Sequence, residues 1–193
     1  MNCIARSLLA AGFFCSLFTH SSWANEFAEA IKLHADSQVK TWLVDPTLVG
    51  AVKAQNAANA QLTQSDIDKL DQAWRAETAA RARPMIDKVL ANPLSVFLKN
   101  KEAASQGLYT ELFVMDNKGL NVGQSQVTSD YWQGDEDKWT QSYGKGPGAI
   151  HISDVEEDES TQTYQSQLSL PIADPDSGEV IGAITIGINV EGL

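Results

Sequence analysis

Apolar residues recur every three or four positions near the start of the chain, which is the period of an amphipathic helix. This repeat covers residues 26–43 and is followed by Asp45-Pro46. Because the residue before a proline is biased away from helical dihedral angles, the helix is expected to end there. The pattern predicts one long N-terminal helix, and its buried face is expected to carry Phe27, Ile31, Ala35, Val39 and Trp42.

Helical spacing resumes after this proline and continues to about residue 98. Thr63 or Ser65 is expected to cap a helix that runs to about Arg83, since a hydroxyl can accept a hydrogen bond from the first turn. Pro84 is expected to kink or restart that helix. Shorter helical stretches are predicted before and after this helix, at residues 47–60 and 94–98.

The hydrophobic pattern changes after residue 107, where short runs of β-branched and aliphatic residues alternate with turn signals. One of these signals, Asp116-Asn117-Lys118-Gly119, predicts a hairpin. Five strands are expected, at residues 108–115, 120–124, 150–153, 164–172 and 180–190. The predicted fold class is therefore α+β, a single domain (residues 25–193) in which long helices (25–107) precede a five-stranded antiparallel sheet (108–193).

The segment between the second and third predicted strands, residues 125–149, has no clear period. Segments of this length inside a compact domain are usually functional or disordered. Its four aromatic rings argue against disorder. The rings either contact a ligand, for example by stacking on a cationic amine, or close a small hydrophobic core beneath the loop. They belong to Tyr131, Trp132, Trp139 and Tyr143.

Residues 1–24 have the layout of a secretory signal peptide. Arg6 precedes an apolar run that ends near Phe18, and Ala24 supplies a small residue at the expected cleavage point. The apolar run is shorter than the roughly 20 residues that span a bilayer. Cys3 and Cys15 both lie in this segment. We therefore expect a periplasmic mature protein without disulfides, beginning near Asn25.

Removal of the signal peptide leaves 13 basic and 25 acidic side chains, a formal charge of −12. Nucleic acids and anionic membrane surfaces would repel such a protein. We therefore expect no nucleic-acid partner.

Motifs of catalysis and metal binding do not occur in the chain. There is no phosphate-binding glycine loop, nucleophile elbow or HExxH sequence, and the three histidines are far apart. The sequence therefore predicts no enzyme, cofactor, catalytic residue or metal site.

Acidic residues gather in two runs, Asp135 to Asp137 and Asp154 to Glu159. A long segment folded over the third strand would join the two runs into a negative pocket for an amine or a Ca²⁺ ion. Otherwise they form a solvated acidic rim. The sequence leaves both interpretations open.

Several segments resemble, in order, the extracytoplasmic PAS-like sensor domains of the Cache family. They are residues 112–119, 129–139, 152–158, 170–174 and 178–184, and the resemblance covers about residues 108–193. It implies a pocket between the sheet and the long segment, in which members of the family bind amino acids, carboxylates or amines.

The resemblance also implies which residues line this pocket. Tyr131, Trp139 and Asp158 take three of the places used by amino-acid-binding members, and Trp132, Lys138 and Tyr143 lie beside them. The place of the family's arginine falls on Asp137, which would not bind a ligand carboxylate. Lys138 offers a point charge without the bidentate fork of arginine. The expected ligand is therefore an amine or a small organic acid rather than a standard α-amino acid.

Typical Cache proteins continue into a transmembrane helix and an intracellular output domain. This chain ends at Leu193, so we expect a free-standing form that passes its state to a membrane-bound kinase, cyclase or chemoreceptor. The alternative is an accessory interaction protein without a small ligand, which dimerises or docks through its N-terminal helix.

Overall fold

The structure is a computed structural model, and it describes residues 25–158 and 163–193. The expected signal peptide with its two cysteines, and Glu159 of the second acidic run, lie outside the described residues. Within the described part of the chain, no helix is both long and apolar enough to cross a membrane.

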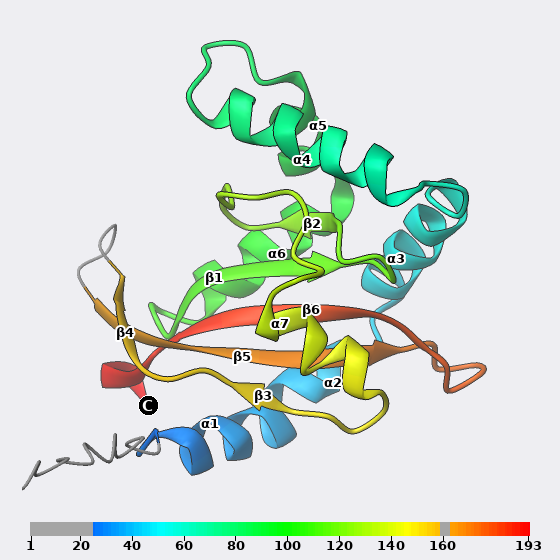
Figure 1. Ribbon diagram of the computed structural model, residues 1–193. Coiled ribbons are helices and arrows are strands. Elements are labelled where there is room, and N and C mark those ends of the chain that lie inside the picture. The colour runs from blue at the N-terminus through cyan, green and yellow to red at the C-terminus, as the bar shows by residue number, and fades with distance from the viewer. Residues whose placement is uncertain (1–24, 159–162) are drawn as a thin grey trace, which may run out of the picture.

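Helices dominate the described chain as far as Ala104 (Figure 1). The N-terminal helix is present but not uniform, because a π-helical stretch (Ala35–Val39) separates α1 (Ala28–His34) from α2 (Lys40–Trp42). The helices that follow are α3 (Pro46–Ala58), α4 (Gln64–Thr78), α5 (Pro84–Leu90) and α6 (Pro93–Ala104).

Capping residues explain where these helices begin and end. Thr63 caps α4 and forms a capping box with Asp66, as one of the two sequence alternatives predicted. Helix α4 ends at Thr78 rather than near residue 83. The Glu77 carboxylate accepts hydrogen bonds from the first backbone N–H groups of α5, at 2.9 and 3.0 Å, so the chain turns back before Pro84 restarts the helix.

The strands form one antiparallel sheet in the order β2-β1-β6-β5-β3, with β4 also paired to β5. The predicted α+β class is confirmed. The described strands number six rather than five, because residues 156–158 form a strand whose run of carboxylates carries no apolar alternation. The strands are β1 (Tyr109–Met115), β2 (Asn121–Gln124), β3 (His151–Ile152), β4 (Glu156–Asp158), β5 (Thr163–Ala173) and β6 (Val180–Asn189).

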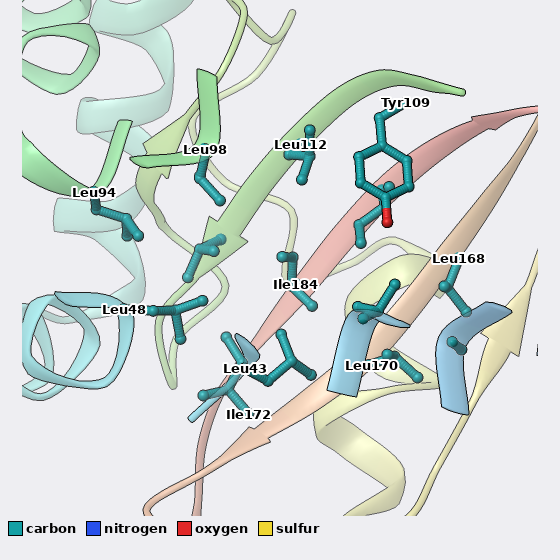
Figure 2. Packing of buried hydrophobic residues seen from close by; sticks show 14 of the residues in the cluster. Leu43, Leu48, Leu94, Leu98, Tyr109, Leu112, Leu168, Leu170, Ile172 and Ile184 are labelled. Carbon is teal, nitrogen blue, oxygen red and sulfur yellow. The ribbon is translucent and has the colours of Figure 1, made fainter. Parts of the chain in front are cut away.

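One face of the sheet packs against the helices and forms the main core. Alternate residues of the two central strands point to this face, such as Leu168 and Leu170 of β5 and Ile184 of β6. Figure 2 shows these side chains in one cluster with Leu43 and Leu48 from the helical layer. The period of two predicted from the sequence thus places alternate residues of β5 and β6 in the helix-covered core.

A second cluster lies beyond β2, where α4 and α5 form a separate pair (Figure 1). Trp74 of α4 is fully buried there, and its indole N–H donates to the Thr128 carbonyl at 2.8 Å. The buried members of this α4–α5 cluster are Ile67, Trp74, Ile86, Val89, Leu120 and Tyr131.

We predict that Trp74→Ala lowers the free energy of unfolding by about 3–5 kcal/mol, since it leaves a large cavity in the α4–α5 cluster. Urea denaturation measures this change. Leu33→Ala is the control, because Leu33 is 70% exposed and its truncation should change stability by no more than about 0.5 kcal/mol. Equal effects of the two variants would contradict the packing described.

Candidate functional site

The long segment between β2 and β3 folds over the face of the sheet that the N-terminal helices leave uncovered. It contains α7 (Asp137–Thr140) and a 3-10 turn (Tyr143–Lys145). In Figure 1 α7 lies in front of β5 and β6. The segment is therefore ordered and positioned by the sheet.

Two of the predicted ligand-binding rings anchor this segment. Trp139 stacks on Tyr143, with ring centroids 4.7 Å apart, and the pair packs against Phe113 and Met115 of β1. The Trp139 indole N–H donates to the Asp116 carbonyl at 3.2 Å. Burial raises the pKa of Tyr143. Both rings thus form a small core beneath the loop, next to the groove described below.

Lys138, on the same helix, is engaged with protein groups. Its side chain is 17% exposed, and its Nζ lies 2.8 Å from Glu136 Oε2. The ammonium also lies 5.5 Å from the centre of the Phe113 ring, within the range of a cation–π contact. The lysine charge is therefore paired before any ligand enters.

A groove of about 710 Å³ separates α7 from β3. It brings the first acidic run together with Asp154 and Glu156 of the second, which is the arrangement that a negative pocket requires. Five carboxylates line it, against one lysine and one histidine. The lining residues are Asp135, Glu136, Asp137, Lys138, His151, Ile152, Ser153, Asp154, Glu156 and Gln167.

Beside the groove the strand residues on this face of the sheet are polar, whereas Phe113 and Met115 of β1, on the same face, are apolar. Ser169 and Thr185 are fully buried, and their hydroxyls are 2.9 Å apart. Gln167, which lines the groove, donates from Nε2 to Glu111 Oε1 at 2.9 Å. The groove thus borders a hydrogen-bonded polar surface rather than a hydrophobic core.

Tyr131 and Trp132 lie elsewhere, in the α4–α5 cluster. Tyr131 is 8% exposed and stacks on Trp74, with ring centroids 5.2 Å apart. Burial, together with the nearby charge of Asp116, raises the pKa of Tyr131 to about 12. The Trp132 indole N–H donates to the Lys118 carbonyl at 2.8 Å. The structure therefore does not bring these two rings together with Trp139 and Tyr143.

Asp158, the last predicted site residue, is the final residue of β4 and pairs with Thr163 of β5. Of its side chain nothing is described. Across residues 25–158 and 163–193, no three histidine, cysteine, aspartate or glutamate side chains are grouped as metal ligands.

Sequence reasoning missed the residues that hold the long segment in place. Asp71 of α4 accepts hydrogen bonds from the backbone N–H groups of Tyr131 and Trp132, at 2.9 and 3.0 Å. Arg75 binds Asp71 and also Asp130, each at 2.7 Å. The four-residue spacing of Asp71 and Arg75 predicts their ion pair. Nothing in the sequence connects that pair to amides 60 residues away.

Helices that precede one antiparallel sheet, with a long segment over the other face of that sheet, agree with the α+β architecture that the resemblance in sequence implied. No family model matches the chain, and no curated protein matches it either. Solved structures similar to it include the sensor domain of a histidine kinase, the sensory domain of one chemoreceptor and the ligand-binding domain of another.

The sensor domain of the V. cholerae histidine kinase DctB is 13% identical, with a TM-score of 0.47 over 86% of this chain and 53% of that chain. The sensory domain of the Campylobacter jejuni chemoreceptor Tlp3 is 15% identical, with a TM-score of 0.41 over 86% and 62%. The ligand-binding domain of the Pseudomonas aeruginosa amino acid chemoreceptor PctC, in complex with GABA, is 10% identical, with a TM-score of 0.34 over 66% and 57%. The alignments thus cover between 53% and 62% of the length of these solved chains.

We predict that Asp71→Ala lowers the free energy of unfolding by about 1–3 kcal/mol, because it leaves two backbone N–H groups near the protein interior without an acceptor. Urea denaturation measures the loss, and faster proteolysis of residues 125–136 should accompany it. Asp68→Ala on the exposed side of the same helix is the matched control. The same loss in both variants would contradict the role of Asp71.

Stability should also depend on two histidines. Burial lowers the pKa of both His34 and His151 in the folded protein. As the pH falls through the ordinary histidine pKa of about 6.5, these two histidines therefore bind protons in the unfolded chain before they do so in the folded protein. The free energy of unfolding should therefore decrease between about pH 7 and about pH 5.5. His151→Gln should flatten this decrease in urea denaturation, and an unchanged slope would refute the assignment.

Proposed function

We propose that the protein is a non-catalytic sensor module that binds a small amine in the acidic groove between α7 and β3. The observation that carries this proposal is the convergence of five carboxylates, from two separate segments of the chain, on one groove.

The charge and size of the groove support a cationic organic ligand. Lys138 is paired with Glu136, so the other carboxylates leave the groove negative. Carboxylates bind ammonium groups through charge-assisted hydrogen bonds. The volume of about 710 Å³ falls in the range typical of small-molecule pockets and is much larger than a bare metal ion needs.

The Lys138–Glu136 pair offers a way for a bound amine to change the protein. An entering ammonium competes with Lys138 for Glu136, and the lysine then shifts relative to Phe113. Since Lys138 and Trp139 are neighbours on α7, this shift moves the helix that rests on the sheet. A ligand that binds one position of α7 more tightly would change the population of that position.

We further propose that this module acts in the periplasm, after export through residues 1–24. It would pass its state to a membrane-bound kinase, cyclase or chemoreceptor. The exposed apolar side chains of Leu33 (70%) and Val44 (55%) are available for such a contact. They equally favour the alternative, an accessory protein that dimerises or docks through its N-terminal helix without a ligand.

A thermal-shift screen of amines tests the proposal, with small carboxylates and Ca²⁺ as comparison ligands. A ligand that binds only the folded state stabilises it by about 2.7 kcal/mol at a hundredfold excess over Kd. We expect amines to raise the melting temperature of the native protein and to have little effect on the double variant Asp154→Asn/Glu156→Gln. The double variant Glu29→Gln/Asp68→Asn is the control, because it changes charge equally on exposed helices.

Three results would count against the amine site. They are the absence of any shift with amines, a shift with Ca²⁺ alone, and equal shifts in the two double variants. Loss of self-association in Leu33→Glu, measured by analytical ultracentrifugation and combined with no ligand response, would support the accessory protein instead.

A further inference from the structure

A second cavity lies away from the acidic groove, at the β2 edge of the sheet. It consists of two adjoining spaces of about 670 and 310 Å³ among α3, α5, α6 and β2. Its walls are largely apolar, with Ala54 and Leu94 on the larger side and Leu70 and Met85 on the smaller. Six residues line both spaces: Gln55, Asn59, Lys88, Asn92, Val122 and Tyr131.

Tyr131 gives this cavity an unpaired polar group. The side chain is only 8% exposed, and its ring is held by stacking on Trp74. Within the described part of the chain, its hydroxyl makes no hydrogen bond, although it lines both spaces. The hydroxyl oxygen is not among the fully buried side-chain atoms that lack a partner, so it is open to the cavity, where a bound molecule can accept its hydrogen bond.

The other polar groups of the cavity wall have largely committed their donors. The side-chain amides of Gln55 and Asn59 donate to Asp116 Oδ2, at 3.1 and 2.9 Å. Asn92 donates from Nδ2 to the Val122 carbonyl at 2.8 Å. Lys88 is exposed at the rim, and it makes no ion pair with the residues described. The hydroxyls of Tyr131 and Thr47 and the Lys88 ammonium are therefore available to a ligand as donors, and Lys88 supplies the positive charge.

Helix α3 lines the exposed rim of this cavity with small residues. Gly50 lies in the interior of the helix, where glycine weakens helical structure. A Cβ atom built on it would meet nothing within 4 Å. A longer side chain there would therefore project into open space beside Ala54 and Ala58, which also line the cavity. Steric packing of the protein does not require glycine at this position.

We propose that this cavity is a second ligand site and that it binds a small carboxylate with a short apolar chain. The carboxylate accepts a hydrogen bond from the Tyr131 hydroxyl and pairs with the Lys88 ammonium. The apolar chain lies along the small face of α3, against Leu94 and Val122. The Asp116 carboxylate accepts four hydrogen bonds from the protein, but its charge still acts on Tyr131, so a bound anion depends on the Lys88 ammonium to balance that charge.

Isothermal titration of the native protein with butanoate, pentanoate, hexanoate and phenylacetate tests the site. We expect saturable binding of at least one acid, weakened at least about tenfold, or 1.4 kcal/mol, in Lys88→Met. Tyr131→Phe should weaken it in the same direction, because this variant keeps the ring on Trp74 and removes only the hydroxyl. Gly50→Leu should block binding by filling the cavity while favouring the helix.

Lys32→Met on α1 is the matched control and should leave the affinity unchanged. No saturable binding of any acid overturns the proposal. So does binding that survives all three cavity variants. Circular dichroism and melting temperature show whether each variant is folded. If Tyr131→Phe does not fold, Lys88→Met and Gly50→Leu still test the site.

The acidic-groove variant Asp154→Asn/Glu156→Gln separates this site from the proposed amine site. It should abolish the response to amines and leave the affinity for the carboxylate unchanged. Loss of carboxylate binding in that variant would overturn the second site. Failure of the amine screen alone would leave the carboxylate result standing.

Discussion

The Asp116 carboxylate is buried in the turn between β1 and β2, where its two oxygens accept hydrogen bonds from four groups. Two of these are backbone N–H groups of the turn itself, and two are side-chain amides of α3. The backbone carbonyl of Asp116 accepts the indole N–H of Trp139. A single residue therefore ties the helical layer, the hairpin and the loop over the sheet to one point. Each of these parts is positioned by satisfying a charge that burial would otherwise make unfavourable.

The loop over the sheet connects the two proposed binding sites. Tyr131, near its beginning, faces the cavity at the β2 edge, and α7, near its middle, borders the acidic groove. Asp71 fixes the first part by its backbone, and the Trp139–Tyr143 pair fixes the second. Coupling between the sites has two routes, through the residues between these anchors and through Asp116, which binds the cavity wall and Trp139. Such coupling would be reciprocal, since each ligand must change the affinity for the other by the same factor.

The sequence predicted elements better than it predicted which residues meet. Hydrophobic period, the Thr63 cap and Pro84 were enough to predict most helices, because these signals are local. The two strong strands, β5 and β6, were predicted for the same reason. Strand β4 was not predicted, because its run of carboxylates has no apolar alternation and only its pairing with β5 makes it a strand.

The predicted site was divided for a related reason. The resemblance placed Tyr131 and Trp139 in one pocket, but Asp71 draws the backbone of Tyr131 toward α4, and Trp139 is held at β1. Contacts between side chains so far apart in sequence leave no periodic signal. The sequence predicted that the two acidic runs would meet only if the long segment folded over the third strand, and no local signal shows where that segment folds.

The π-helical stretch at residues 35–39 has its origin in the spacing of the buried residues around it. Ile31, Ala35, Val39 and Leu43 follow one another at intervals of four. In a regular helix of 3.6 residues per turn, each such interval overshoots a full turn by about 40°, so the stripe would wind away from the sheet. The wider π turn takes up more residues per revolution and brings the stripe back into line. The π-helical turn therefore keeps buried residues that are four positions apart on one side of the helical segment, the side that faces the sheet.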